Sequence, residues 1–125
     1  NAIAPAMLCQ ACLPLLRQSP RAIIVNLSSS FASIGRKTSA TPYRYSYSMS
    51  KSALNMLTRT LAFELAADNV LAVAIHPGWT RTGIGGPQAQ FSAAEAAANL
   101  LNVVANLTAE QSGQYLTWLG EPLAW

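Results

Sequence analysis

Tyr47 and Lys51 stand four residues apart in the stretch 41–51, TPYRYSYSMSK, near the expected start of a long helix. At about 100° per residue, this spacing places both side chains on one face of the helix, one turn apart. A phenol normally loses its proton near pH 10, and a neighbouring ammonium lowers the pKa because it favours the phenolate. The pair therefore suits proton transfer at neutral pH. Because the spacing also occurs by chance, the interpretation depends on the elements around it.

The length and composition are those of a single domain, or part of one, with unusually few charged residues. Only 10% of the 125 residues are charged and 51% are hydrophobic, whereas about 25% charged residues are typical. Such a chain is expected to have many of its surfaces covered by other elements or other chains. The net charge of +3 comes from scattered basic residues, and Arg36-Lys37 is their longest run. The basic residues are too sparse to form a nucleic-acid-binding or membrane-binding patch.

The first third of the chain predicts a helix and then a strand. Residues 1–16 are rich in apolar side chains, and we expect a mostly buried helix that Pro14 kinks or loosens. The run is too short to cross a bilayer and lacks the basic region of a signal peptide. Residues 22–27, AIIVNL, are typical of a strand buried on both faces. A polar segment that begins with Ser28-Ser29-Ser30 follows this strand.

Thr41-Pro42 predicts the start of the long helix, with a hydroxyl at the N-cap and proline at the first helical position. We expect this helix to run to about residue 67 with two apolar faces, one formed by Leu54, Leu57, Leu61 and Leu65, the other by Met49, Ala53, Met56 and Phe63. A helix that is apolar on two sides must contact two partners, such as a sheet and another helix.

The remaining chain predicts two further strands and one helix. Residues 70–75 form a second buried strand that ends at His76-Pro77-Gly78, and residues 79–91 form a Gly- and Pro-containing loop. Ser92 and Glu95 predict a capping box for a helix through about residue 107. A turn at 112–113 leads to a last strand at 114–119. Alternating helices and strands indicate an α/β fold with a parallel, Rossmann-type sheet and flanking helices.

In a parallel sheet of this kind, ligands bind at the carboxyl ends of the strands. Ser28-Ser29-Ser30 follows the first strand, and the Pro77-Gly78 turn with Thr80 and Thr82 follows the second. The first turn of the long helix should open on the same edge, so that serine, tyrosine and lysine converge there. A hydroxyl donor, a phenol and a cation suit proton transfer to or from a carbonyl or alcohol oxygen.

The motifs NLSSSFASIG, YSMSK and HPGWTRT, in this order, resemble the catalytic half of the short-chain dehydrogenase/reductase family. Asn1-Ala2-Ile3-Ala4 is similar to that family's Asn-x-x-Gly helix start. The segments HPGWTRTGIGGPQAQFSAAEAA and SGQYLTWLGEPLAW resemble the C-factor-like carbonyl reductase subgroup. The resemblance covers nearly all 125 residues and implies the C-terminal portion of a doubly wound, three-layer fold.

The resemblance also implies residue roles. Tyr47 would be the catalytic acid/base, Lys51 would lower its pKa and hold the ribose hydroxyls of the cofactor, and Ser29 would hydrogen-bond the substrate oxygen. Asn1 would hold a water that relays protons from Lys51. The turn that contacts the nicotinamide end would comprise Pro77, Gly78, Trp79 and Thr82.

The reaction implied is hydride transfer between NAD(P)H and a carbonyl/alcohol pair, a small-molecule substrate. The subgroup resemblance slightly favours NADP over NAD. We expect a cytoplasmic homodimer or homotetramer that pairs through its first two helices.

The sequence departs from the family pattern in three respects. Ala4 and Ala32 stand where the family usually has glycine, and the spacing from Ser29 to Tyr47 is longer than the commonest one. A Gly-rich phosphate-binding turn is absent from these residues, so we expect the N-terminal dinucleotide-binding units of the fold to be missing and the first strand to form a bare sheet edge. The alternative function is therefore a truncated, non-catalytic relative that acts as a binding or signalling module or as a subunit.

The other candidate residues have simpler interpretations. Cys9 and Cys12 form Cys-x-x-Cys in mid-helix, and His76 is the single histidine, so we expect no metal site and two reduced cysteines that serve packing. Ser28, Ser30 and His76 are expected to be strand-end residues. Tyr43 and Tyr45 are expected in the loop or at the rim of the site.

Overall fold

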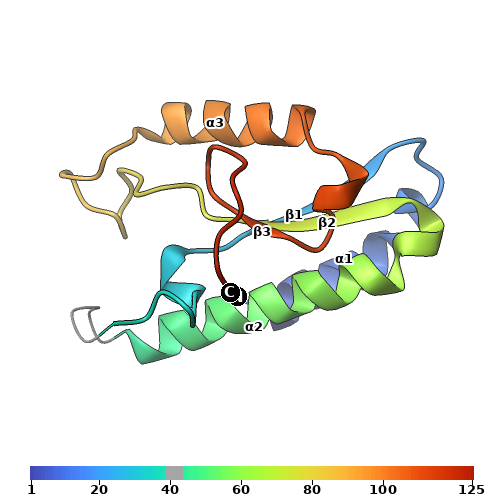
Figure 1. Cartoon of the computed structure of the whole chain (residues 1–125), viewed down its shortest axis with the longest axis horizontal. Coiled ribbons are helices and arrows are strands. Elements are labelled where there is room, and N and C mark those ends of the chain that lie inside the picture. The colour runs from blue at the N-terminus through green and yellow to red at the C-terminus, as the bar shows by residue number, and fades with distance from the viewer. Residues whose placement is uncertain (39–43) are drawn as a thin grey trace.

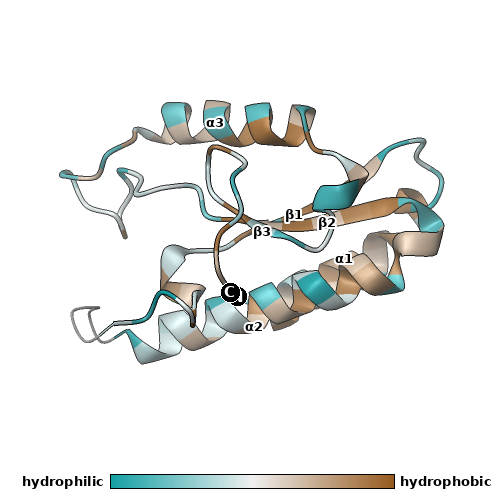
Figure 2. Ribbon diagram, in the orientation of Figure 1, coloured by the Kyte–Doolittle hydropathy of each residue, from teal (hydrophilic) through white to brown (hydrophobic). Residues whose placement is uncertain are grey.

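The structure is a computed structural model that describes residues 1–38 and 44–125. A three-stranded sheet forms the middle layer, with α1 (Ile3–Leu16) and α2 (Tyr45–Glu64) on one face and α3 (Ala93–Ala105) on the other (Figure 1). Hydrophobic residues concentrate along the strands between the two helical layers (Figure 2). This three-layer arrangement confirms the predicted α/β class.

The sheet is parallel and has the strand order β1-β2-β3. The bounds of β1 (Ala22–Leu27) and β2 (Val70–Ile75) agree with the prediction, and the two strands pair from Ala22 with Val70 to Leu27 with Ile75. The third strand, β3 (Tyr115–Leu116), is shorter than the predicted 114–119. It ends early because the chain reverses, with the Thr117 N–H donating to the Glu121 carbonyl and Gly120 at a φ of 79°.

The first strand lies at the sheet edge, as predicted, but only one of its faces is fully buried. Ala22, Ile24 and Asn26 are buried, whereas the alternate residues are half-buried and Leu27 is 48% exposed. The difference arises because the helix on the other face, α3, packs mainly on β2 and β3, through contacts of Val103 and Leu107 with Val73, Ile75 and Leu116.

The prediction of a mostly buried first helix is wrong for this chain. In α1 only Cys9 is buried, and Ile3 is 78% exposed. One side of the helix packs through Cys9, Leu13 and Leu16 against β1 and α2. Within the part of the chain that the structure describes, no element covers its other side.

The second helix begins at Tyr45, with Arg44 at the N-cap. Thr41 and Pro42, where we predicted its start, lie outside the described residues. The helix ends at Glu64, three residues before the predicted end, because the chain tightens into a 3-10 turn (Ala66–Asp68) and Asn69 adopts a left-handed conformation with a φ of 55°. Its first apolar face packs on the sheet, while Met49, Met56 and Phe63 of the second face stay exposed.

The third helix starts with the predicted capping box. The Glu95 N–H donates to Ser92 Oγ at 3.2 Å, and the Ser92 N–H donates to Glu95 Oε2 at 2.7 Å. At the other end of α3, the guanidinium of Arg21 donates to the carbonyls of Val104, Ala105 and Leu107. Arg21 precedes β1, so these contacts join the helix end to the start of the sheet. Among the described residues, no helix is long and apolar enough to span a membrane.

Candidate active site

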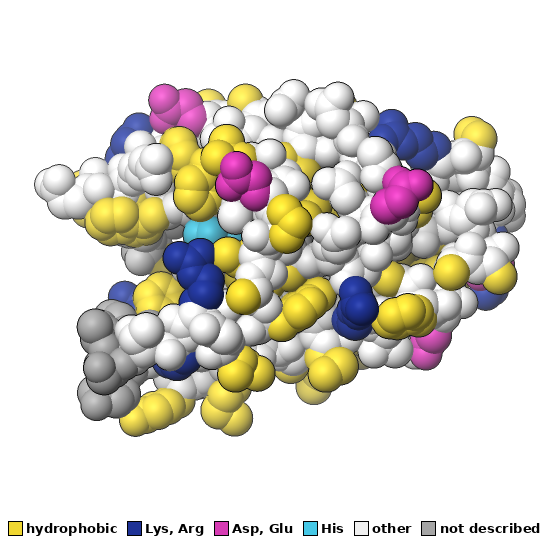
Figure 3. All heavy atoms as spheres, in the orientation of Figure 1, with side chains coloured by type: hydrophobic (Ala, Val, Ile, Leu, Met, Phe, Trp, Pro, Cys, Tyr) yellow, Lys and Arg dark blue, Asp and Glu magenta, His cyan; other side chains and the backbone are white. Residues whose placement is uncertain are grey.

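A cavity of about 740 Å³ lies where β1 and β2 end. Figure 3 shows the hollow on the side of the molecule where the loops after the strands meet, with the single histidine visible in it. Its wall combines the serine segment after β1, the turn after β2, one turn of α2, the loop at 79–85 and the start of α3. The predicted site residues among its lining are Ser29, Tyr47, Pro77, Gly78, Trp79 and Thr82.

The serine segment continues the sheet and then turns into the cavity. The Ser28 N–H donates to the Ile75 carbonyl at 2.8 Å, which extends the β1–β2 ladder by one bond. Ser29 is buried, and its Oγ accepts from the Phe31 N–H at 3.3 Å, which caps a 3-10 turn (Ser30–Ala32). The Tyr115 hydroxyl donates to the Ser29 carbonyl, and burial raises the pKa of that phenol to about 12. One hydrogen bond to the side chain of Ser29 and one to its carbonyl thus fix the position of this residue.

Tyr47 lines the cavity, and Lys51 lies one helical turn behind it. The Tyr47 ring meets Phe31 edge-on, with ring centroids 6.3 Å apart. Lys51 Nζ donates to the Leu27 carbonyl at 2.6 Å, and desolvation by burial lowers the pKa of this ammonium. Lys51 therefore contacts the end of β1 and does not line the cavity.

Two polar residues that sequence reasoning missed join α2 to β1. The Ser28 hydroxyl donates to Asn55 Oδ1 at 2.5 Å, and Asn26 Nδ2 donates to Thr58 Oγ1 at 2.9 Å, both within the buried core. Together with Lys51, Asn55 and Thr58 form a polar stripe along the helix face that bears Tyr47. The signal was present in the sequence: polar residues four, eight and eleven positions after Tyr47 fall on its helix face.

The turn after β2, which we predicted to contact the nicotinamide end of a cofactor, lines the cavity. Gly78 has a φ of 82°, in the left-handed region that favours glycine. Trp79 Nε1 donates to the Gly85 carbonyl at 2.8 Å, and the Gly85 N–H donates to Thr82 Oγ1 at 3.2 Å. These bonds fold the loop on itself beside the cavity.

Asn1 is not among the residues that line the cavity. Its Nδ2 donates to Ser50 Oγ at 2.9 Å, and the residue itself is exposed. The structure thus places Asn1 next to the residue that precedes Lys51. Tyr45 is 72% exposed, and Tyr43 lies outside the described residues.

His76 forms part of the cavity wall. Its backbone N–H donates to the Leu116 carbonyl at 2.8 Å, and its ring meets Trp118 edge-on at 5.5 Å. Nδ1 is buried without a hydrogen-bond partner among the described residues. Burial, with a smaller contribution from the charge of Arg36, lowers the pKa of this imidazole to about 4. His76 is therefore neutral at pH 7.

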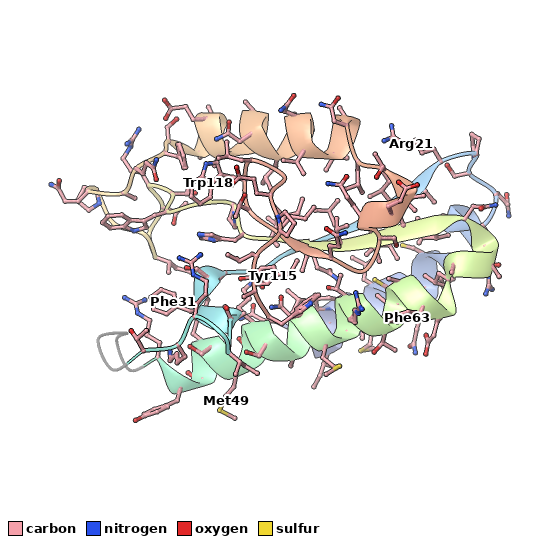
Figure 4. The ribbon with its side chains drawn as sticks, viewed as in Figure 1. Arg21, Phe31, Met49, Phe63, Tyr115 and Trp118 are labelled. Carbon is pink, nitrogen blue, oxygen red and sulfur yellow. The ribbon has the colours of Figure 1, made fainter. Side chains whose placement is uncertain are left out.

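The geometry supports proton transfer in a partly apolar cavity. Serine and tyrosine hydroxyls line one cavity together with the aromatic side chains of Phe31 and Trp79, and a cation lies one helical turn from the tyrosine. Figure 4 shows Phe31 on the side of α2 and Trp118 on the side of α3. Among the described residues, no group of three His, Cys, Asp or Glu side chains could hold a metal. Cys9 and Cys12 are free thiols, and burial raises the pKa of Cys9.

A family model described as enoyl-(acyl carrier protein) reductase matches residues 1–124. C-signal of Myxococcus xanthus is 34% identical over 125 residues, which cover 100% of this chain and 74% of C-signal.

Solved carbonyl reductases have the same fold. Carbonyl reductase Sniffer of D. melanogaster superimposes with a TM-score of 0.93 at 34% identity. The NADPH-bound carbonyl reductase from chicken fatty liver superimposes with a TM-score of 0.91 at 35% identity. Each comparison covers 100% of this chain and 54% of the other, so the chain spans about half the length of these two enzymes.

The backbone at Gly78 generates a first prediction. A methyl group there would come within 2.6 Å of Phe91 Cε2, in addition to the strain of its positive φ. Gly78→Ala should therefore lower the free energy of unfolding by roughly 2–4 kcal/mol. Gly86→Ala is the matched control, because Gly86 has a φ of 78° but a methyl group meets no atom within 4 Å. The control should lose only about 1 kcal/mol. Equal losses in urea titrations would contradict the predicted contact with Phe91.

The neutral His76 generates a second prediction. Its pKa is about 4 in the folded protein, against the ordinary 6.5 of an exposed histidine in the unfolded chain, so only the unfolded state gains a proton as the pH falls between these values. The contribution to stability is complete above pH 6.5 and is lost progressively toward pH 4. Between pH 6.5 and 5 the free energy of unfolding should fall by roughly 1–2 kcal/mol.

The control is His76→Gln, in which this part of the pH dependence should disappear. Urea titrations of both proteins between pH 8 and 5 measure the effect, because carboxylates contribute mainly below that range. An identical slope in the variant would mean that another group titrates.

Proposed function

We propose that this chain, which belongs to the short-chain dehydrogenase/reductase family, carries the proton-transfer site of an NAD(P)-dependent oxidoreductase. Its substrates would be a carbonyl/alcohol pair. The single observation that carries the proposal is the shared cavity of Ser29 and Tyr47 at the carboxyl ends of β1 and β2. The relatives that are named as carbonyl reductases support the reaction class.

Each hydroxyl has a distinct part in the proposed reaction. Ser29 Oγ already accepts a hydrogen bond from Phe31, so its own O–H can donate to the substrate oxygen. Tyr47 donates its phenolic proton to that oxygen when a carbonyl is reduced and accepts the proton when an alcohol is oxidised. The Lys51 ammonium, held by the Leu27 carbonyl, places positive charge one turn from the phenol. When bound, the nicotinamide cofactor supplies or accepts the hydride.

The cavity suits the nicotinamide end of such a cofactor together with a small substrate. Its volume of about 740 Å³ lies within the usual range of roughly 300–1,000 Å³ for ligand sites. Its threonine hydroxyls can form hydrogen bonds, and the small side chains at the start of α3 leave room beside them. The residues that would hold the nicotinamide end are Pro77, Gly78, Trp79 and Thr82, with Tyr47 on the ribose side. Lys51, which bonds to the Leu27 carbonyl outside the cavity lining, would have to leave this carbonyl to reach the ribose. The NADPH in the chicken enzyme supports NADP as the preferred cofactor.

Asn1 is proposed to act beside α2, outside the lining of the cavity. Its hydrogen bond to Ser50 places its amide beside the residue that precedes Lys51. A water held between the amide and the ammonium would connect Lys51 to solvent. The free thiols of Cys9 and Cys12 support a reducing compartment, and we propose the cytoplasm.

The uncovered faces of α1 and α2 support a homodimer or homotetramer. In α2, Met49, Met56 and Phe63 recur every seven residues, and each is at least 68% exposed. Ile3, Met7, Leu8 and Leu15 of α1 are at least 64% exposed. Regularly spaced apolar residues along a helix favour pairing with another helix. We propose that a second copy of the chain covers this surface.

The catalytic proposal predicts the effect of Tyr47→Phe. The variant keeps the ring that contacts Phe31 but loses the transferable proton, so NAD(P)H-linked turnover should fall by about 10²–10⁴-fold. Cofactor affinity and the unfolding midpoint should stay close to wild type. The control is Tyr45→Phe on the exposed side of the helix start, which should keep full turnover.

A spectrophotometric assay of NADPH oxidation by the intact protein measures the turnover of both variants. Wild-type turnover by Tyr47→Phe would remove Tyr47 from the mechanism. A wild-type protein that binds neither carbonyl compound nor cofactor would favour the non-catalytic alternative, a binding or signalling module or a subunit.

The oligomer proposal predicts the effect of a charge on the apolar stripe of α2. Met56→Glu would bury a carboxylate between helices, which costs several kcal/mol, so the oligomer should dissociate. The control is Leu101→Glu, because Leu101 is 70% exposed on α3, on the opposite face of the sheet. Light scattering coupled to gel filtration gives the mass of each species. Wild-type mass for Met56→Glu would place the interface elsewhere.

A further inference from the structure

Arg44 is a cation in the cavity wall that the proposed mechanism does not use. It stands at the N-cap of α2, three residues before Tyr47, and lines the same cavity. Its Cζ lies 5.4 Å from the centroid of the Phe31 ring, and the same ring meets Tyr47 edge-on. Phe31 therefore places the guanidinium and the phenol on neighbouring sides of one aromatic group.

Two further cations follow Phe31 in the chain, Arg36 and Lys37. Lys37 Nζ is 5.8 Å from the Phe31 centroid, and the positive charge of Arg36 acts on both His76 and Tyr115. The C-terminal segment holds this basic stretch in place, because Ser33 Oγ donates to the Ala124 carbonyl and the Gly35 N–H donates to the Trp125 carbonyl. In Figure 3 a basic side chain lies directly beside the histidine at the hollow.

No acidic side chain balances these charges at the cavity. All five acidic residues are described, and none of them lines the cavity. The two ion pairs of the described chain use Arg17 with Asp68 and Arg81 with Glu95. Arg44 is therefore the one charged side chain in the described lining of this cavity, and an anion that enters would neutralise its charge.

A guanidinium beside an aromatic ring is well suited to bind a carboxylate. Arg44 lies at cation–π distance from Phe31, and the N–H groups of a guanidinium match the two oxygens of a carboxylate. The half-buried side chain of Leu100 in the cavity wall reduces the competition from water. An uncharged substrate would obtain none of this interaction energy.

We propose that the preferred substrates are carbonyl compounds that carry a carboxylate, and that Arg44 binds this carboxylate while Ser29 and Tyr47 hold the carbonyl oxygen. This inference rests on the proposed function and adds the substrate class. Residues three apart at a helix start are neighbours, so a short aromatic or aliphatic spacer beside Phe31 connects the two ends of the substrate. In the reaction the carbonyl carbon gains a hydride and its oxygen gains a proton, and the carboxylate is unchanged.

The experiment compares 4-carboxybenzaldehyde with methyl 4-formylbenzoate as substrates of the intact protein with NADPH. The two compounds have the same aldehyde and ring and differ in the charge at the far end. The wild-type protein should prefer the carboxylate. Arg44→Met should raise KM for 4-carboxybenzaldehyde about 10-fold or more, with little change for the ester and for NADPH. Arg44→Lys, which retains the charge, should recover part of the preference.

The matched control is Arg17→Met. It removes the same charge from the chain, but Arg17 follows α1 and pairs with Asp68 after α2, away from the cavity. Its preference between the two aldehydes should equal that of the wild type. A loss of preference in this control would mean that the overall charge, and not Arg44, selects the substrate, and it would overturn the inference.

Binding of benzoate and of benzamide gives a second readout that needs no turnover. Trp79 lines the cavity, so titration calorimetry can be supplemented by quenching of tryptophan fluorescence. Benzoate should bind more tightly than benzamide to the wild type, and Arg44→Met should abolish the difference.

The two proposals fail in distinguishable ways. Turnover of both aldehydes without dependence on Arg44 leaves the oxidoreductase proposal standing and overturns the carboxylate site. Benzoate binding that depends on Arg44, without any turnover, supports the carboxylate site and overturns the catalytic proposal. If Arg44→Met weakens NADPH as much as it weakens the carboxylate, Arg44 binds the cofactor and the inference is overturned.

Discussion

Six consecutive residue pairs, from Ala22 with Val70 to Leu27 with Ile75, hold β1 and β2 together in parallel. A parallel ladder brings the carboxyl ends of two strands to one edge, whatever the length of chain between them. Here the ladder continues by one bond, from the Ser28 N–H to the Ile75 carbonyl. Ser29 and the Pro77-Gly78 turn face one cavity because of this register. A shift by one residue would turn Ser29 to the opposite face of the sheet.

The orientation of α2 depends on the same two strands. Its polar stripe of Lys51, Asn55 and Thr58 bonds to three successive positions at the end of β1, with Asn55 and Thr58 buried. A buried polar group without a partner costs about 1–3 kcal/mol. Rotation of the helix by a fraction of a turn would therefore break several of these bonds at once. The stripe directs Tyr47 into the cavity, and the leucines beside it pack on the sheet.

Local sequence patterns predicted where the helices and strands lie better than they predicted what covers each element. The capping box of α3 and the bounds of β1 and β2 depend on residues within a few positions of each other, and all were confirmed. The burial of α1 was predicted wrongly, because an apolar helix has the same sequence pattern whether this chain or another chain covers it. The end of β3 was misplaced because it depends on a turn back onto the strand, in which the Leu123 N–H donates to the Tyr115 carbonyl.

The sequence by itself determined the α/β order, the family resemblance and the spacing of Tyr47 and Lys51 on one helix face. These properties follow from periodicity and motif order, which are readable along the chain. Only the tertiary structure decided that Arg44, Phe31 and His76 share a cavity with Ser29 and Tyr47, and that Asn1 lies outside its lining. The reason is physical: neighbours across a sheet edge depend on strand register and helix rotation, and both are set by packing between segments far apart in the sequence.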